Sequence, residues 1–90
     1  MNTPKLFLEL IDLFKVLPDD EVIRIELING NKIYCLPSDE LYSDSSIITI
    51  VKPIKDQRQK IIIDVNTIAV VCTMSRLTYD LKLQRGELYV

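Results

Sequence analysis

Hydrophobic and polar positions divide the chain into one N-terminal helix followed by a series of short strands. Near the start, apolar residues are interrupted by four polar residues at helical spacing, Lys5, Glu9, Asp12 and Lys15. Thr3-Pro4 is typical of a helix start, because Thr caps free N–H groups and Pro suits the first helical position. Pro18 disfavours helical geometry in the residue before it. We therefore predict a helix over residues 4–17.

From Glu21 onward the helical period gives way to the alternation of half-buried strands. After the first hairpin, strands are predicted at 46–51, 60–65 and 68–74. The serine- and aspartate-rich segment 38–46 between them is predicted to be a loop. A helix followed by short strands over 21–74 favours a small barrel or roll, and the 90 residues suffice for a single domain, 1–90.

The first hairpin turns at Asn29-Gly30. A two-residue loop would place charged residues opposite core residues. A three-residue loop over 29–31 pairs Leu27 with Ile33 and Ile25 with Cys35, which keeps one face apolar, so we predict this register. Gly30 or Asn31 is then expected in the left-handed conformation.

The C-terminal segment 75–90 is predicted to be an additional strand or a tail. Apolar residues alternate strictly with polar ones through most of it, at Leu77, Tyr79, Leu81 and Leu83. A helix is the alternative for this segment.

The amino-acid composition limits the catalytic and ligand-binding sites that the chain could form. The chain has no histidine, only two glycines, a net charge of −2 and 48% hydrophobic residues, with an isoelectric point near 5.0. This inventory supports neither a catalytic base beside a nucleophile nor a glycine-rich phosphate loop, so we expect no enzyme, no cofactor and no metal site. Cys35 and Cys72 lie in apolar strand patterns and are expected to be reduced. No signal peptide or membrane segment is recognisable, and we expect a cytoplasmic protein.

The predicted helix is more apolar than an ordinary surface helix, with apolar residues over about three quarters of its circumference. A domain of this size has little surface with which to cover such a helix. We therefore expect homo-oligomer contacts through the helix, while burial across the end of the barrel is the alternative. The interface candidates are Leu6, Phe7, Leu10, Phe14 and Val16.

A polar connection over 52–60 carries the main local concentration of positive charge, in Lys52, Lys55, Arg58 and Lys60. Such a patch, repeated around a ring of subunits, would bind the backbone of single-stranded RNA. No aromatic residue for base stacking is interleaved with these four, which favours a solvated hairpin loop instead.

The order of elements resembles the Sm-like family of small five-stranded barrels. Val22 to Ile33 resembles the family's first strand and glycine turn, and Ile61 to Val71 resembles its fourth strand, short break and fifth strand. The resemblance covers residues 4–74 and implies a barrel that can bind RNA. Asp64-Val65-Asn66-Thr67 stands where the family carries a basic or glycine-bearing RNA-contact stretch, and an acid there disfavours RNA binding.

The sequence thus predicts a mainly β protein with an N-terminal helix, folded as a five- or six-stranded SH3-like or Sm-like barrel. We expect a non-catalytic binding or regulatory module that works as a homo-oligomer through protein–protein contacts, with another protein as a further partner. A single-stranded RNA-binding ring is the alternative.

Overall fold

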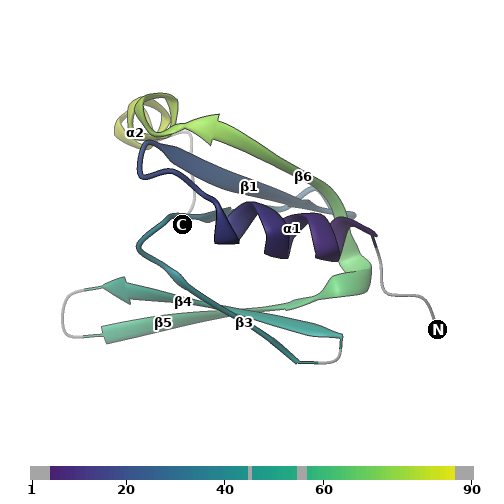
Figure 1. The fold of residues 1–90 in the computed structure, drawn as a ribbon. Helices are drawn as coiled ribbons and strands as arrows, with labels where there is room; N and C mark the ends of the chain where they lie inside the picture. The colour runs from purple at the N-terminus through teal and green to yellow at the C-terminus, as the bar shows by residue number, and fades with distance from the viewer. Residues whose placement is uncertain (1–4, 45, 55–56, 87–90) are drawn as a thin grey trace.

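A computed structural model of the chain describes residues 5–44, 46–54 and 57–86 (Figure 1). The helices are α1 (Lys5–Lys15) and α2 (Arg76–Gln84). The strands are β1 (Glu21–Leu27), β2 (Lys32–Cys35), β3 (Glu40–Asp44), β4 (Ile47–Ile54), β5 (Gln57–Asp64) and β6 (Ile68–Ser75), and a short 3₁₀ turn, η1 (Val65–Thr67), separates the last two. The prediction of a mainly β chain behind an N-terminal helix is confirmed. The predicted helix start at Thr3-Pro4 lies outside the described residues.

The strands form two separate three-stranded antiparallel sheets, in the orders β2-β1-β6 and β3-β4-β5. The prediction of a five- or six-stranded SH3-like or Sm-like barrel is therefore wrong: within the described residues, no ladder joins the two sheets. The chain passes from one sheet to the other twice, between β2 and β3 and between β5 and β6, and a local turn separates the strands at each place. At the first, Pro37 offers no N–H, and the Asp39 N–H donates to the Leu36 carbonyl over 3.0 Å in a tight turn. At the second, the Asp64 side chain caps η1 by accepting the Asn66 N–H at 2.9 Å.

The β1–β2 hairpin keeps one face apolar, as predicted, but its register differs from the prediction by two residues. Ile25 pairs with Ile33 and Ile23 with Cys35. The three-residue loop covers 28–30, because the Leu27 N–H donates to the Asn31 carbonyl over 2.8 Å. A shift of two residues preserves which side chains share a face, so the apolar pattern alone does not distinguish the two registers. Gly30 takes the left-handed conformation, with φ of 89°.

Two segments have a different structure from the one predicted. Residues 40–44, predicted to be a loop, form β3, which pairs with β4 along its whole length. Residues 76–84, predicted first as a strand, form α2, so the alternative is the correct one there. Ser75 caps this helix by accepting the Thr78 N–H at 3.1 Å, and Arg76 pairs with Asp80 one turn later.

The main core fills the space between the two sheets and α1, which lies between them in Figure 1. Its fully buried side chains come from α1, β1, β2 and β4: Leu10, Ile23, Ile25, Cys35, Ile48 and Ile50. A second cluster forms on the opposite face of β1, where α2 covers Val22 and Tyr34 with Tyr79. Among the described residues, other elements thus cover the β2-β1-β6 sheet on both faces and the β3-β4-β5 sheet on one.

Candidate functional site

The uncovered face of the β3-β4-β5 sheet, called here the outer sheet face, is the candidate site. Alternate residues of its strands point into the core, among them Ile48, Ile50 and Ile63, so the residues between them point outward. The outward positions of the three paired strands are Glu40, Tyr42, Asp44, Ile47, Thr49, Val51, Pro53, Arg58, Lys60, Ile62 and Asp64.

The centre of the outer sheet face exposes large apolar side chains. The register places Tyr42, Thr49 and Ile62 in one row across the three strands. Tyr42 is 55% exposed and Ile62 is 68% exposed, and Ile47 in the neighbouring row is 45% exposed. A row of exposed apolar groups on a sheet face is typical of a surface that another molecule covers.

Charged residues occupy the two ends of the outer sheet face. At one end, the Arg58 guanidinium donates to Glu40, and the Tyr42 hydroxyl donates to the same carboxylate over 2.7 Å. These hydrogen bonds, first from Tyr42 and then from Arg58, lower the pKa of Glu40, and the bond to Glu40 raises the pKa of Tyr42. At the other end, Asp44 and Asp64 flank Ile47 in one row.

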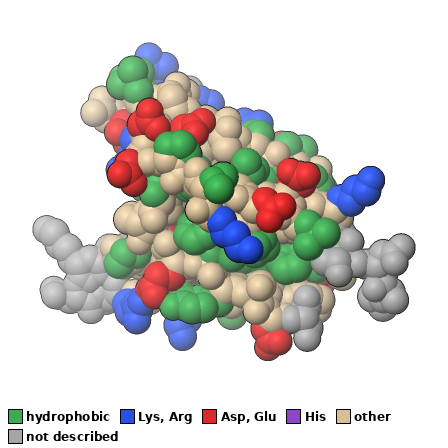
Figure 2. Space-filling view, in the orientation of Figure 1, with side chains coloured by type: hydrophobic (Ala, Val, Ile, Leu, Met, Phe, Trp, Pro, Cys, Tyr) green, Lys and Arg blue, Asp and Glu red, His purple; other side chains and the backbone are tan. Residues whose placement is uncertain are grey.

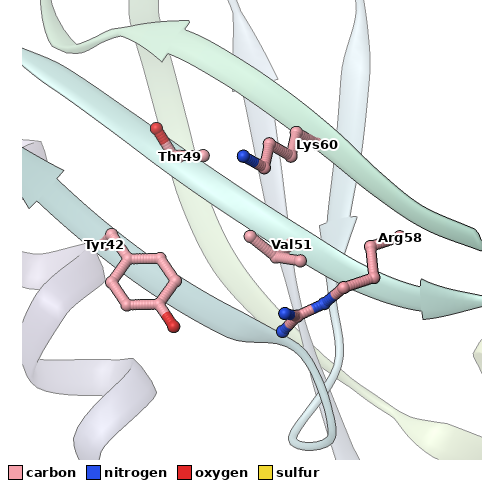
Figure 3. A pocket seen from close by; sticks show the side chains of 5 residues that line it. All are labelled: Tyr42, Thr49, Val51, Arg58 and Lys60. Atoms are coloured by element: carbon pink, nitrogen blue, oxygen red, sulfur yellow. The ribbon is translucent and has the colours of Figure 1, made fainter.

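An open depression of about 370 Å³ lies on the outer sheet face near its basic end (Figure 3). Tyr42 from β3, Thr49 and Val51 from β4, and Arg58 and Lys60 from β5 line it. Val51 is almost fully buried by these neighbours. The depression therefore combines an aromatic ring, a hydroxyl, two cations and an aliphatic side chain.

The four basic residues predicted as an RNA-binding group do not form one patch. Arg58 and Lys60 lie on the outer sheet face, but the Lys52 side chain points into the molecule and is only 5% exposed. Lys55 lies outside the described residues. The predicted 52–60 loop is largely wrong, because β4 extends through Lys52 and β5 begins at Gln57.

Lys52 instead joins the two sheets through a buried network. Its Nζ lies 2.6 Å from Asp39 Oδ2 and donates to the Tyr34 carbonyl over 2.6 Å. The same Asp39 oxygen accepts the Leu36 N–H at 2.9 Å. The two oxygens therefore satisfy a cation that would otherwise be buried without a partner.

Cys35 lies in the main core beside this network. Burial, with a smaller contribution from the Asp39 carboxylate, raises the pKa of the Cys35 thiol to about 12. The thiol therefore stays protonated at neutral pH and is a poor nucleophile. Both cysteines of the chain are free thiols, and Cys72 is partly buried.

The interface candidates on α1 are divided between the core and the surface. Leu10 is fully buried, and Leu6, Phe7 and Phe14 are half-buried against the main core. Val16 lies just after the end of α1 and is 74% exposed. Figure 2, drawn from the side of α1, shows hydrophobic side chains interspersed with charged ones on this face. Most of the apolar surface of α1 is therefore covered by the chain's own sheets.

Sequence reasoning did not identify the residues that make up the centre of the outer sheet face, namely Tyr42, Thr49, Val51 and Ile62. A signal for Ile62 is present in the run Ile61-Ile62-Ile63, because only alternate residues of a strand can face one core. Tyr42 carries no such signal, since the serine- and aspartate-rich segment around it is typical of a loop.

Among residues 5–44, 46–54 and 57–86, no cluster of three or more His, Cys, Asp or Glu side chains has the arrangement of a metal site. Neither described helix is long and apolar enough to cross a membrane. In comparisons with known proteins, no family model, curated protein or solved structure matches this chain.

Proposed function

We propose that this protein is a non-catalytic binding module that self-associates through protein–protein contacts on its outer sheet face. The observation that carries the proposal is the row of Tyr42 and Ile62 on either side of Thr49, with both large side chains more than half exposed. The free thiols of Cys35 and Cys72 support a cytoplasmic location for such a module.

The outer sheet face is preferred to α1 as the contact surface because of the apolar area that it exposes. Covering a fully exposed Leu, Ile or Phe side chain contributes about 1.5–3 kcal/mol, in proportion to the area removed from water. Leu10 has no exposed area left to contribute, whereas Ile62 is 68% exposed. Leu8 is the large apolar side chain of α1 that stays exposed, whereas Tyr42, Ile47 and Ile62 are exposed in neighbouring rows of the outer sheet face.

A non-catalytic role is supported by the chemistry of the chain. It contains no histidine, and burial keeps the Cys35 thiol protonated. The cations of the depression, Arg58 and Lys60, can bind and orient a partner.

Sedimentation velocity at roughly 10–500 μM, a range that covers weak interfaces, tests the proposal. We expect the average mass of the wild type to rise with concentration. Ile62→Lys is expected to shift the protein to monomer, because each copy would bring a charge into the apolar centre. Val16→Lys, an identical charge change at an exposed position just after the end of α1, is the matched control and is expected to behave as the wild type. A wild type that stays monomeric throughout, or dissociation by Val16→Lys and not by Ile62→Lys, would contradict the proposal.

Single-stranded RNA is the second candidate ligand, and one observation favours it. Although no aromatic residue neighbours Arg58 and Lys60 in sequence, the fold brings Tyr42 of β3 into the same depression as these two residues of β5, with β4 between the two strands. An aromatic ring next to cations is the combination that binds unpaired bases and their phosphates. It ranks second because Glu40 already pairs with Arg58 and the chain carries a net charge of −2.

Fluorescence anisotropy with a labelled oligouridine at low salt tests this candidate. Binding that weakens on addition of salt, and that is reduced by Arg58→Gln together with Lys60→Gln, is the expected result. Lys32→Gln on β2, away from the outer sheet face, is the control and is expected to leave binding unchanged. Absence of binding at low salt rules the candidate out.

A further inference from the structure

We propose that the partner on the outer sheet face is a second copy of this chain, packed face to face about a two-fold axis that runs across the strands. In this arrangement Arg58 of each copy lies over Asp64 of the other. The inference rests on the proposed function, in which the chain self-associates, and adds the geometry of that contact.

The argument begins with the order of outward residues along β5. Arg58, Lys60, Ile62 and Asp64 follow one another on the same face, so the strand is basic at one end, apolar in the middle and acidic at the other. Six residues of strand span about 20 Å, which separates the charges of Arg58 and Asp64 widely within one copy. A surface with opposite charges at its two ends is complementary to itself when one copy is reversed.

When the strands of the two copies are aligned, two face-to-face arrangements have two-fold symmetry, and charge distinguishes them. An axis across the strands reverses their direction and keeps β5 over β5, so Arg58 faces the second copy's Asp64. An axis along the strands places β5 over β3, so Lys60 faces Glu40 but Asp64 faces Asp44. The second arrangement opposes two pairs of carboxylates, which is unfavourable. The first opposes no like charges on β5.

The Arg58 guanidinium and the Asp64 carboxylate can both form the proposed contact between copies. The Arg58 side chain is 65% exposed, and its contact with Glu40 uses one terminal nitrogen of a guanidinium that has five N–H donors. Asp64 is exposed, and within the described part of the chain its carboxylate accepts one hydrogen bond, from the Asn66 N–H to Oδ1. Each group can therefore make the contact across the interface without giving up its partner within the chain.

The size of the face predicts how strong the association is. Three strands about 4.8 Å apart and about 20 Å long present roughly 300 Å² per copy, less than half of the ~800 Å² typical of a stable complex. The dimer is therefore expected to be weak, and ionic pairs at its rim make it sensitive to salt.

Asp64→Asn and Asp44→Asn test the arrangement, because both remove one carboxylate from the same row. Asn caps helical turns as well as Asp does, so η1 is expected to persist in Asp64→Asn. The proposal predicts that Asp64→Asn raises the dimer dissociation constant about three- to tenfold, with two exposed ion pairs lost. Asp44→Asn is expected to change it less than twofold. Sedimentation equilibrium at low salt measures both.

A charge exchange provides a second measurement. Arg58→Glu and Asp64→Lys are each expected to weaken the dimer, and the double variant is expected to recover most of the loss. Contacts of these residues within one chain would not be restored by the exchange, so recovery reports on the interface. Thermal unfolding of each variant shows that the fold is retained.

The remaining outcomes overturn the arrangement. Tighter association of both Asp64→Asn and Asp44→Asn would indicate the axis along the strands. No effect of Asp64→Asn, while Ile62→Lys still gives monomer, would overturn this geometry and leave the proposed function standing. No effect of Ile62→Lys would overturn the proposed function itself.

Discussion

At the scale of single residues, Lys52 shows how a charge can occupy a core position of a strand. The alternation of Ile48 and Ile50 assigns the next inward position of β4 to Lys52, and its side chain does point inward. Its aliphatic stem follows the core, while the ammonium group reaches Asp39 and the Tyr34 carbonyl at the boundary between the sheets. The pair therefore ties β4 to β2 and to the turn that follows it.

We expect Lys52→Met to lower the free energy of unfolding by about 3–5 kcal/mol, because Asp39 would stay buried without its cation. The double variant Lys52→Met with Asp39→Asn is expected to recover part of this loss, since the amide is neutral. Lys60→Met, on the neighbouring strand but exposed, is the control and should change stability by less than about 0.5 kcal/mol. Urea denaturation measures all three, and equal effects of Lys52→Met and Lys60→Met would contradict this role of the buried pair.

At the scale of elements, α2 covers one face of the β2-β1-β6 sheet. Its strict alternation of apolar residues is the pattern of a strand, yet only Tyr79 is buried, and Leu77 and Leu81 are exposed. Burial of Tyr79 raises its pKa, and its ring lies 5.5 Å from that of Tyr34 between centroids. A helix forms here because the Ser75 cap and the contact of one aromatic residue with the sheet outweigh the alternation.

Tyr79→Ala is expected to lower the free energy of unfolding by about 3–5 kcal/mol, as removal of a large buried aromatic side chain does. Tyr79→Phe keeps the ring and should retain most of the stability. Leu77→Ala, in the same helix at a side chain that is 70% exposed, is the matched control. Thermal unfolding compares them, and a Tyr79→Ala effect no larger than that of Leu77→Ala would show that α2 is not held by this contact.

At the scale of the whole molecule, α1 and the main core connect two sheets that share no ladder within the described residues. Leu10 from α1 is fully buried with side chains of β1 and β4. The sheets are therefore expected to unfold together, because neither has another apolar layer to cover its inner face.

Leu10→Ala is expected to lower the free energy of unfolding by about 2–5 kcal/mol and to reduce the protection of both sheets equally. Hydrogen exchange of the β1 and β4 amides measures the two sheets separately. Leu8→Ala, two positions earlier and exposed, is expected to leave both unchanged within about 0.5 kcal/mol. Loss of protection in β1 with full protection in β4 would mean that the sheets unfold independently.

Local patterns account for much of the fold. Proline and the spacing of polar residues placed the helix that forms α1, and alternation placed β1 and much of β4, β5 and β6. The turn at Gly30 followed from its freedom to adopt positive φ. These features depend on neighbours in sequence, which is why the pattern predicts them.

The candidate site depends on contacts that sequence alone does not contain. Segment 40–44 becomes a strand only because β4 offers its edge, and this pairing brings Tyr42 beside Arg58 and Lys60. Lys52 does not join Arg58 and Lys60 on the surface, because its side chain forms a buried ion pair with Asp39 from another part of the chain.

The sequence by itself determined the elements other than β3 and α2, and which of their faces are apolar, since period and turn chemistry are local properties. The tertiary structure decided that the strands divide into two sheets, that α2 covers one of them, and that the other keeps an uncovered face. The physical reason is that strand pairing and side-chain burial bring together residues that are far apart in the chain. The free energy gained from these contacts exceeds the local conformational preferences that a sequence pattern reflects.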